Sequence, residues 1–315
     1  MTTSDSPDAA LAGALAAAAT GHASGAVKRF TTGSQHYVFE VELEGRAPVV
    51  VRASLPRDRG LAAGSVKFSR LLRPLGVPLP AILAEDLDAA FPYVIFERLP
   101  GTDLGHVIGT LGAARLEAIA AEVARAQSIV GKLPTAGRYG YAADPADAPR
   151  SRWSDILDDS IAKSRKRIIA AGYYDLEPVA AAQEVLAALR QQADEQSATP
   201  YLHDTTTKNV IVAPDGTFSG IVDVDDLCYG DPRSPIALTM AATMAFTGGS
   251  PYADLWMKHA GYPDDRLFRL YVALCLLDFM SEQGQVFNGN ESSSTPEMRR
   301  HLKALLGTQL RLAQG

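Results

Sequence analysis

An aspartate, an asparagine and a second aspartate between residues 201 and 232 have the types and spacing that metal-assisted phosphoryl transfer requires. Asp204 stands five residues before Asn209, and Asp223 follows a second apolar segment. Transfer of a γ-phosphoryl group needs a carboxylate near the acceptor hydroxyl and oxygen ligands for metal on the triphosphate. Carboxylate and amide oxygens are ligands that Mg²⁺ prefers. We therefore predict that Asp204 is the catalytic residue and that Asn209 and Asp223 bind Mg²⁺.

A β-hairpin would bring the two metal ligands together, and the sequence predicts one. Residues 209–212 and 218–222 are mostly apolar and β-branched, and Asp215-Gly216 between them is a strong turn signal. The hairpin would return the chain so that Asn209 and Asp223 become neighbours. A carboxylate at the buried end of a strand is costly unless it meets a cation or hydrogen-bond donors, which favours metal binding by Asp223.

The whole block resembles the aminoglycoside phosphotransferase family, whose fold is similar to that of the protein kinases. The resemblance is carried by Asp204 and Asn209, the hairpin, the pair Asp223 and Asp225, and the Gly-Asp-Pro at 230–232. It covers roughly residues 28 to 240 and is most specific in this block. It implies an α+β, bilobal, protein-kinase-like fold with a small β-rich N-terminal lobe and a larger, mainly helical C-terminal lobe. It also implies ATP or GTP as the donor, with Mg²⁺.

The resemblance places nucleotide-binding residues in the first lobe. The segment 31–37 is similar to the turn that covers the nucleotide, and Arg52 falls where kinases place a phosphate-binding lysine. Main-chain groups around residues 97–99 match the connection between lobes that binds a purine base. The implied nucleotide-binding residues are Gly33, Ser34, Arg52, Glu97 and Leu99.

Three features of the sequence depart from the family pattern. Kinase-like folds pair the phosphate-binding cation with a helix glutamate, yet no Asp or Glu occurs from Arg59 through Ala84. His203 directly precedes the predicted catalytic aspartate, whereas the family has its histidine one residue earlier, so we interpret His203 as structural or substrate-facing. Pro235 stands where many relatives carry an aspartate, and we expect it to alter the start of the following helix.

Two further aspartates near the block have secondary roles in this interpretation. Asp225 lies where relatives often carry an acidic residue, and it is a candidate for supporting the metal site without binding the metal directly. Carboxylates this close to Asp223 repel each other unless a cation is present. Asp231 is expected to tie its loop to the next helix rather than to touch substrate.

The elements around the block divide into two predicted domains. Residues 1–100 would form the nucleotide-binding lobe, with an N-terminal helix from Ser6 to Gly21, an antiparallel sheet and one helix over 61–75. Residues 101–315 would form the helical lobe with the catalytic loop and the hairpin. The nearly continuous apolar run 267–280 predicts a buried helix.

Composition excludes several classes of protein. The formal charge is −6 and the pI is about 5.6, which argues against a nucleic-acid binder because such proteins need basic surface. Only Cys228 and Cys275 are present, so neither a disulfide framework nor a zinc site is expected. There is no basic signal region and no apolar run long enough to span a bilayer. We therefore predict a cytoplasmic protein without a membrane partner.

The acceptor is the least determined part of the prediction. Asp278 and Glu282 lie on or just after the apolar run and are candidates for binding a polar or cationic acceptor, with buried structural pairing as the alternative. Aminoglycosides are polycations and would favour a cleft lined by carboxylates, whereas macrolides would favour more apolar walls. The partner is thus predicted to be a small molecule with a hydroxyl group, such as an antibiotic.

Two other functions remain open from the sequence. A nucleotide-binding regulator without transferase activity is suggested by the missing helix glutamate and by Pro235. A metal-dependent phosphohydrolase is suggested by the adjacent His203 and Asp204, but the threonines that follow make a poor helix.

Overall fold

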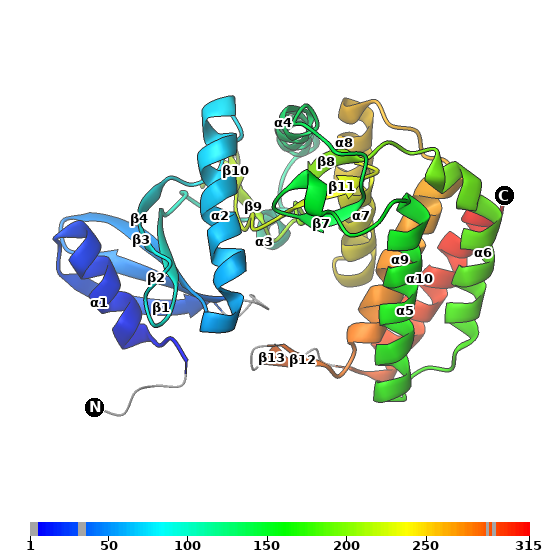
Figure 1. Cartoon of the computed structure of the whole chain (residues 1–315), viewed down its shortest axis with the longest axis horizontal. Coiled ribbons are helices and arrows are strands. Elements are labelled where there is room, and N and C mark those ends of the chain that lie inside the picture. Colours follow the sequence, from blue (N-terminus) through cyan, green and yellow to red (C-terminus); the bar gives the residue numbers. More distant parts are fainter. Residues whose placement is uncertain (1–5, 31–35, 288–289, 292–293) are drawn as a thin grey trace.

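A computed structural model of the chain describes residues 6–30, 36–287, 290–291 and 294–315, and Figure 1 shows how the elements are arranged. The N-terminal elements are α1 (Ala9–Thr20), β1 (Ser24–Phe30), β2 (Tyr37–Leu43), β3 (Arg46–Ala53), α2 (Arg59–Leu72), β4 (Ile82–Asp86) and β5 (Tyr93–Glu97). They are followed by β6 (Thr102–Asp103), α3 (Leu104–Val107), α4 (Ala113–Val130), β7 (Gly140–Ala142), α5 (Trp153–Ala171), α6 (Glu177–Asp194), β8 (Thr199–Leu202), β9 (Val210–Val212), β10 (Phe218–Ile221) and β11 (Leu227–Gly230). The chain ends with α7 (Ser234–Phe246), α8 (Tyr252–Ala260), α9 (Arg266–Glu282), β12 (Val286–Phe287), β13 (Asn290–Glu291) and α10 (Pro296–Gln314).

The N-terminal strands form an antiparallel sheet in the order β1-β2-β3-β5-β4. Alternation along β2 places Phe39 and Val41 on one face, where they pack with small residues of α1. That helix begins later than predicted, because Asp8 rather than Ser6 caps it by accepting from the backbone of Leu11. It ends at the predicted Gly21, which has the positive φ of 71° that glycine tolerates best.

Helix α2 packs against both halves of the molecule. Phe68 and Leu72 lie in one hydrophobic cluster with Ile221 of β10, whereas Val66 packs with Val94 and other residues of the N-terminal sheet. Figure 1 shows this helix between the sheet and the helical part of the chain. The helix thus packs against the C-terminal part as well as against the N-terminal sheet.

The C-terminal part is mainly helical and is built around α9. The predicted buried helix over 267–280 is confirmed, because α9 lies within the largest hydrophobic cluster and packs against α5, α6, α7 and α10. Two three-stranded sheets, in the orders β10-β9-β6 and β7-β11-β8, and the two-stranded sheet β12-β13 accompany the helices. After Glu97 the chain leaves the N-terminal sheet, and β6 pairs with β9. The division at residue 100 remains a prediction.

No helix in the described ranges has the length and apolar character needed to cross a membrane.

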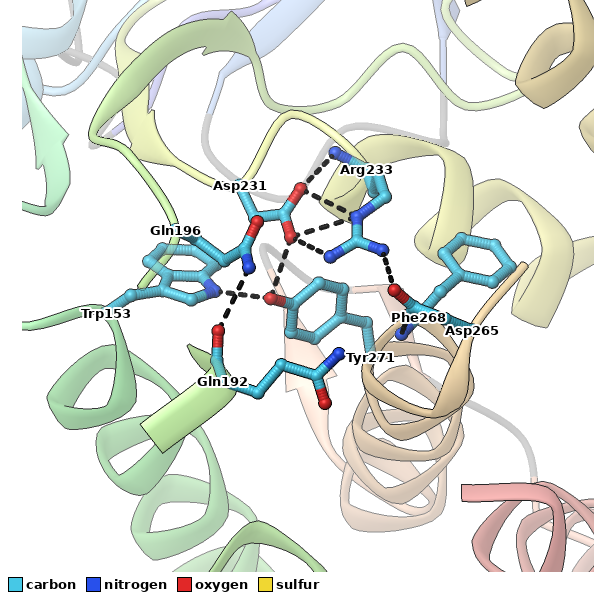
Figure 2. A network of polar contacts seen from close by, with 8 residues as sticks. All are labelled: Trp153, Gln192, Gln196, Asp231, Arg233, Asp265, Phe268 and Tyr271. Atoms are coloured by element: carbon cyan, nitrogen blue, oxygen red, sulfur yellow. Dashed lines mark hydrogen bonds and ion pairs between the residues drawn. The ribbon is translucent and has the colours of Figure 1, made fainter. Parts of the chain in front are cut away.

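A buried polar network fixes the loop between β11 and α7, as Figure 2 shows. The Asp231 carboxylate, 1% exposed, accepts hydrogen bonds from the Arg233 guanidinium at 2.6 Å and from the Tyr271 hydroxyl at 2.9 Å. Arg233 also donates to Asp265 at 2.9 Å, and the Trp153 indole donates to Tyr271 at 2.9 Å. The structure confirms that Asp231 ties its loop to the following elements. Helix α7 begins with Pro235 at its second residue, as its restricted φ allows.

Replacement of Asp231 by alanine should destabilise the protein strongly. It would leave the buried Arg233 with only Asp265 as an anionic partner and would remove the acceptor of Tyr271. Breaking a buried ion pair in this way costs about 3–5 kcal/mol, which corresponds to a decrease of the melting temperature on the order of 10 °C. Thermal unfolding followed by circular dichroism measures it.

The matched control is Asp159→Ala, which breaks a surface pair with Arg150. Because both side chains are about half exposed, the melting temperature should stay near that of the wild type. Equal effects of the two substitutions would contradict a stabilising role for the buried network.

Candidate active site

Asp204 lies in a turn directly after β8, and the loop that follows is closed by its own side chains. One Asp204 carboxylate oxygen accepts from the Thr206 hydroxyl at 2.8 Å, which fixes the carboxylate. The Asn209 side-chain amide donates to the Asp204 carbonyl at 2.8 Å, so the loop is bridged over five residues. An amide that donates through its nitrogen still has its oxygen as an acceptor or a metal ligand. Asp204 and Asn209 are thus joined by hydrogen bonds within one loop.

The predicted hairpin is confirmed and brings the second predicted metal ligand back to this loop. Ile221 pairs with Val210 in the β9–β10 ladder, and the Val222 amide donates to the Asn209 carbonyl at 2.9 Å. Asp223 directly follows Val222, which contacts Asn209. The hairpin therefore brings Asp223 next to the loop that contains Asn209. Asp223 has φ of 67°, the one positive value for a residue other than glycine in the described ranges. This uncommon conformation, which aspartate adopts more readily than most residues, turns the chain sharply at the end of the strand.

Asp223 and Asp225 face Arg52, which reaches them from β3. The Arg52 guanidinium lies 3.0 Å from the Asp223 carboxylate and also pairs with Asp225. Burial alone would raise the pKa of Asp225, but Arg52 together with His36 lowers it to about 2. Partial loss of solvent around its carboxylate raises the pKa of Asp223, although about half of the side chain is exposed; Arg52 opposes this rise and the charge of Asp225 adds to it. Asp225 is thus the better neutralised carboxylate, and Asp223, about half exposed, is the one that gains most from an added cation.

The donor set at this end of the hairpin suits a hard cation. Asn209 and Asp223 offer an amide and a carboxylate oxygen, which matches Mg²⁺ held by few protein ligands and completed by nucleotide phosphates and water. Among the described residues no group of three or more His, Cys, Asp or Glu is placed to hold a metal ion by itself. A site that depends on the nucleotide for further ligands does not need such a group.

Gln127 of α4 supports the catalytic loop and was missed by the sequence analysis. Its amide nitrogen donates to the Leu202 carbonyl at 2.8 Å and to the Thr205 hydroxyl at 2.9 Å, and its amide oxygen accepts from the Leu202 backbone at 2.9 Å. It therefore holds the chain on the N-terminal side of Asp204. A glutamine inside a helical pattern carries no local signal for this role, because its partner lies 75 residues away.

The structure describes three of the five residues predicted to bind nucleotide, namely Arg52, Glu97 and Leu99. Gly33 and Ser34 lie outside the described residues. The Glu97 side chain accepts from the backbone of Ala81 at 2.8 Å, and its own amide donates to the Ala81 carbonyl at 2.9 Å. The Leu99 carbonyl accepts from the Arg98 guanidinium. A role for Glu97 and Leu99 in binding a purine base remains a prediction.

The connection between lobes packs closely on the β9–β10 hairpin. A Cβ atom on Gly220 would lie 2.6 Å from the Pro78 carbonyl and 2.7 Å from a Leu99 methyl group. A Cβ on Gly101 would lie 1.8 Å from the Val212 carbonyl. Both approaches require glycine, and they fix the spacing between the hairpin and the connection.

The two candidate acceptor-binding carboxylates are already paired with cations of α5. Asp278 accepts from Lys163 at 3.1 Å and from Arg167 at 3.2 Å. Arg167 also lies 3.6 Å from Glu282, whose pKa is raised by burial and by the charge of Asp278. The structure therefore supports the pairing alternative that the sequence left open. It does not show contact with an acceptor.

His203 contacts an aromatic ring and not a metal cluster. Its ring lies edge-on to Tyr141, with centroids 4.7 Å apart, and one ring nitrogen is 3.0 Å from the Tyr141 hydroxyl. Burial lowers the pKa of His203, while the neighbouring Asp204 acts in the opposite direction. This packing is consistent with the structural or substrate-facing role assigned to His203.

Comparison with known proteins identifies the family. A model of the phosphotransferase enzyme family (APH) matches residues 26–271. No curated protein matches the sequence.

The fold is shared with solved phosphotransferases at low sequence identity. A thermostable mutant of aminoglycoside phosphotransferase APH(4)-Ia is 17% identical with a TM-score of 0.68, over 96% of this chain and 99% of that one. The streptomycin–ATP complex of APH(2")-IIa gives 13% identity and a TM-score of 0.65, over 95% and 96% of the two chains. A putative fructosamine-3-kinase from Thermobifida fusca gives 18% identity and a TM-score of 0.61, over 96% and 98%. These likenesses confirm the predicted protein-kinase-like fold.

The family model covers nearly all of the N-terminal sheet, the loop that holds Asp204 and Asn209, and the β9–β10 hairpin. The protein therefore belongs to the phosphotransferase enzyme family and is a small-molecule kinase.

Proposed function

We propose that this protein is a Mg²⁺-dependent O-phosphotransferase that moves the γ-phosphoryl group of ATP or GTP to a hydroxyl of a small molecule. The observation that carries the proposal is the contact between Val222 and Asn209, which sets Asp223 beside the loop that holds Asp204. An acceptor-orienting carboxylate and two oxygen ligands for metal then share one rigid unit. Related solved structures hold ADP or AMP-PNP together with hygromycin B, which agrees with a nucleotide donor.

The side chains divide the reaction between them. Asp204 accepts a hydrogen bond from the acceptor hydroxyl, aims its oxygen at the γ-phosphorus and receives its proton as the new P–O bond forms. The bond from the γ-phosphorus to the bridging oxygen breaks, and the nucleoside diphosphate leaves. Arg52 contributes guanidinium donors toward the phosphates. Mg²⁺ held by Asn209 and Asp223 would neutralise charge on the β- and γ-phosphates. Catalysis is then mainly positioning and charge neutralisation.

The pairing of Asp278 and Glu282 with cations supports an acceptor that carries few positive charges. Because Lys163 and Arg167 already neutralise Asp278, and Arg167 also lies beside Glu282, a polycationic aminoglycoside would have to displace these pairs. A neutral polyhydroxyl compound would not, and a macrolide with a single amino group would compete with these pairs far less than a polycation. Among the antibiotic acceptors considered from the sequence, we therefore rank those with little positive charge above the aminoglycosides.

Of the two features that suggested a regulator without activity, the missing helix glutamate has another explanation in the structure. Arg52 lacks a helix glutamate but pairs with Asp225, so the absence of an acidic residue in α2 does not leave this cation without a carboxylate. The phosphohydrolase alternative rested on His203, which contacts Tyr141.

Nucleotide binding is the first result to test. In a thermal-shift titration we expect ATP or GTP to raise the melting temperature by several degrees, and more with Mg²⁺ than without it. A ligand at about 100 times its dissociation constant adds roughly 2.7 kcal/mol of stability, which is enough to detect. AMP, which lacks the phosphates that would bind the metal with Asp223, serves as the control for Mg²⁺ dependence. No shift with ATP or GTP would contradict the proposed function.

A further inference from the structure

Arg52 is a buried cation of the site. Its carboxylate partners come from a different element than in the protein kinases. Its side chain is 8% exposed and pairs with Asp225 and Asp223. Helix α2 packs beside Arg52 but contributes only one hydrogen-bond partner, the Ser65 hydroxyl, to which the guanidinium donates at 3.1 Å. In protein kinases the corresponding lysine must pair with a glutamate of a helix for the enzyme to be active. Here the carboxylate comes from the loop after the β9–β10 hairpin.

Asp225 is itself held in place from the N-terminal sheet. One carboxylate oxygen, Oδ2, accepts from Arg52 and lies 3.0 Å from His36 Nε2. The other ring nitrogen of His36 lies 2.8 Å from the Ser54 hydroxyl. His36 and Ser54 are both buried, so the imidazole is fixed at both nitrogens. The order Ser54, His36, Asp225, Arg52 is a continuous chain of contacts between the sheet and the hairpin loop.

Helix α2 lies close against the loop that carries Asp225. A Cβ atom on Gly64 would lie 2.1 Å from the carbonyl oxygen of Asp225. The main chain of α2 therefore rests directly on the loop, and the small Ser65 is what reaches Arg52 at this spacing. Since the loop already brings a carboxylate to the guanidinium, a glutamate from the helix is not needed.

We propose that Asp225 is the positioning residue that holds Arg52 on the nucleotide phosphates, in place of a helix carboxylate, and that His36 in turn fixes Asp225. This inference rests on the proposed function. Asp225 follows Asp223 by two residues, so the phosphate-binding cation and the predicted metal ligand are set by the same short loop. Movement of α2 alone would not separate Arg52 from its carboxylate, in contrast to the helix-controlled pair of the kinases.

Substitution of Asp225 by serine tests the first part. We expect the variant to bind the triphosphate nucleotide roughly 10- to 100-fold more weakly, which is the range for losing a hydrogen bond to a charged group. Affinity for the corresponding nucleoside, which lacks phosphates, should be unchanged. Isothermal titration calorimetry on the full chain gives both values. Triphosphate binding within about twofold of the wild type would overturn the proposal.

A carboxylate placed on α2 tests whether Asp225 acts on Arg52 through its charge. In the Asp225→Ser background, Ser65→Asp should recover at least about tenfold of the lost triphosphate affinity, because Ser65 already contacts Arg52. The matched control is Ser65→Asn in the same background, which has nearly the same shape without the charge and should recover little. Equal recovery by Asp and Asn would show that packing, and not an ion pair, is what Asp225 supplies, and would overturn the proposal.

The role of His36 is tested separately with His36→Phe, which keeps a ring but removes both nitrogens. We expect a smaller loss of triphosphate affinity than in Asp225→Ser, and no further loss when the two substitutions are combined, since they break one chain of contacts. Additive losses would overturn the linkage between His36 and Asp225.

Failure of this inference is distinguishable from failure of the proposed function. A wild-type protein that binds ATP or GTP while the Asp225 variants bind equally well would remove the role of Asp225 and leave the function standing. A wild-type protein that binds neither nucleotide would remove both.

Discussion

Replacement of Asp204 by asparagine is expected to reduce phosphoryl transfer by roughly 100- to 10,000-fold, the range that general acid–base catalysis contributes. The substitution keeps the size of the side chain and an oxygen that can accept from Thr206, so the loop should hold its shape. It removes the charge that orients the acceptor hydroxyl and receives its proton. Steady-state kinetics with an acceptor found by screening measures the loss, and slow hydrolysis of the nucleotide provides a readout before an acceptor is known.

Nucleotide binding separates this catalytic role from a structural one. Asp204→Asn should show the same magnesium-dependent thermal shift as the wild type, because the proposed metal ligands are Asn209 and Asp223. The matched control is Asp215→Asn in the hairpin turn, where Asn-Gly favours the same turn as Asp-Gly. That variant should keep wild-type activity. Full activity of Asp204→Asn would remove the assignment.

The parts of the site that the sequence predicts correctly are those with local signals. The Asp-Gly turn and the β-branched segments on either side specify the hairpin through short-range chemistry. The strand Tyr37–Leu43 and the buried helix around 267–280 follow from hydrophobic pattern in the same way. The nearness of Asn209 and Asp223 follows from the hairpin and needs no knowledge of the rest of the fold.

The contacts that the sequence could not predict join residues that are far apart along the chain. Arg52 and Asp225 are separated by 173 residues, and Lys163 and Asp278 by 115. A pattern of composition can show that α2 lacks a carboxylate, but only the packed structure shows which loop supplies one. For the same reason, Asp278 was a candidate for binding an acceptor until its distance from Lys163 was known. Ion pairs between elements that are distant in the sequence depend on the tertiary fold, and no periodic pattern in the sequence reveals them.

Replacement of Asp223 by asparagine should lower phosphoryl transfer by roughly 100- to 1,000-fold, the scale of losing one preorganised electrostatic contact. In contrast to Asp204→Asn, this variant should also lose the magnesium-dependent part of the thermal shift, because the metal would lose its charged ligand. The melting temperature without nucleotide should stay close to that of the wild type. Arg52 keeps Asp225 as its partner, and removal of one carboxylate relieves repulsion between the two aspartates.

The backbone at this position allows the electrostatic role to be separated from stability. Asp223 has φ of 67°, a conformation that asparagine adopts readily and alanine does not. Asp223→Ala should therefore lose activity as Asp223→Asn does, but it should also lose about 1 kcal/mol of unfolding free energy from backbone strain. Chemical denaturation of both variants measures this difference. If the asparagine variant keeps a normal magnesium response, Asp223 is not the metal ligand, and its strained conformation must serve the ion pair with Arg52 instead.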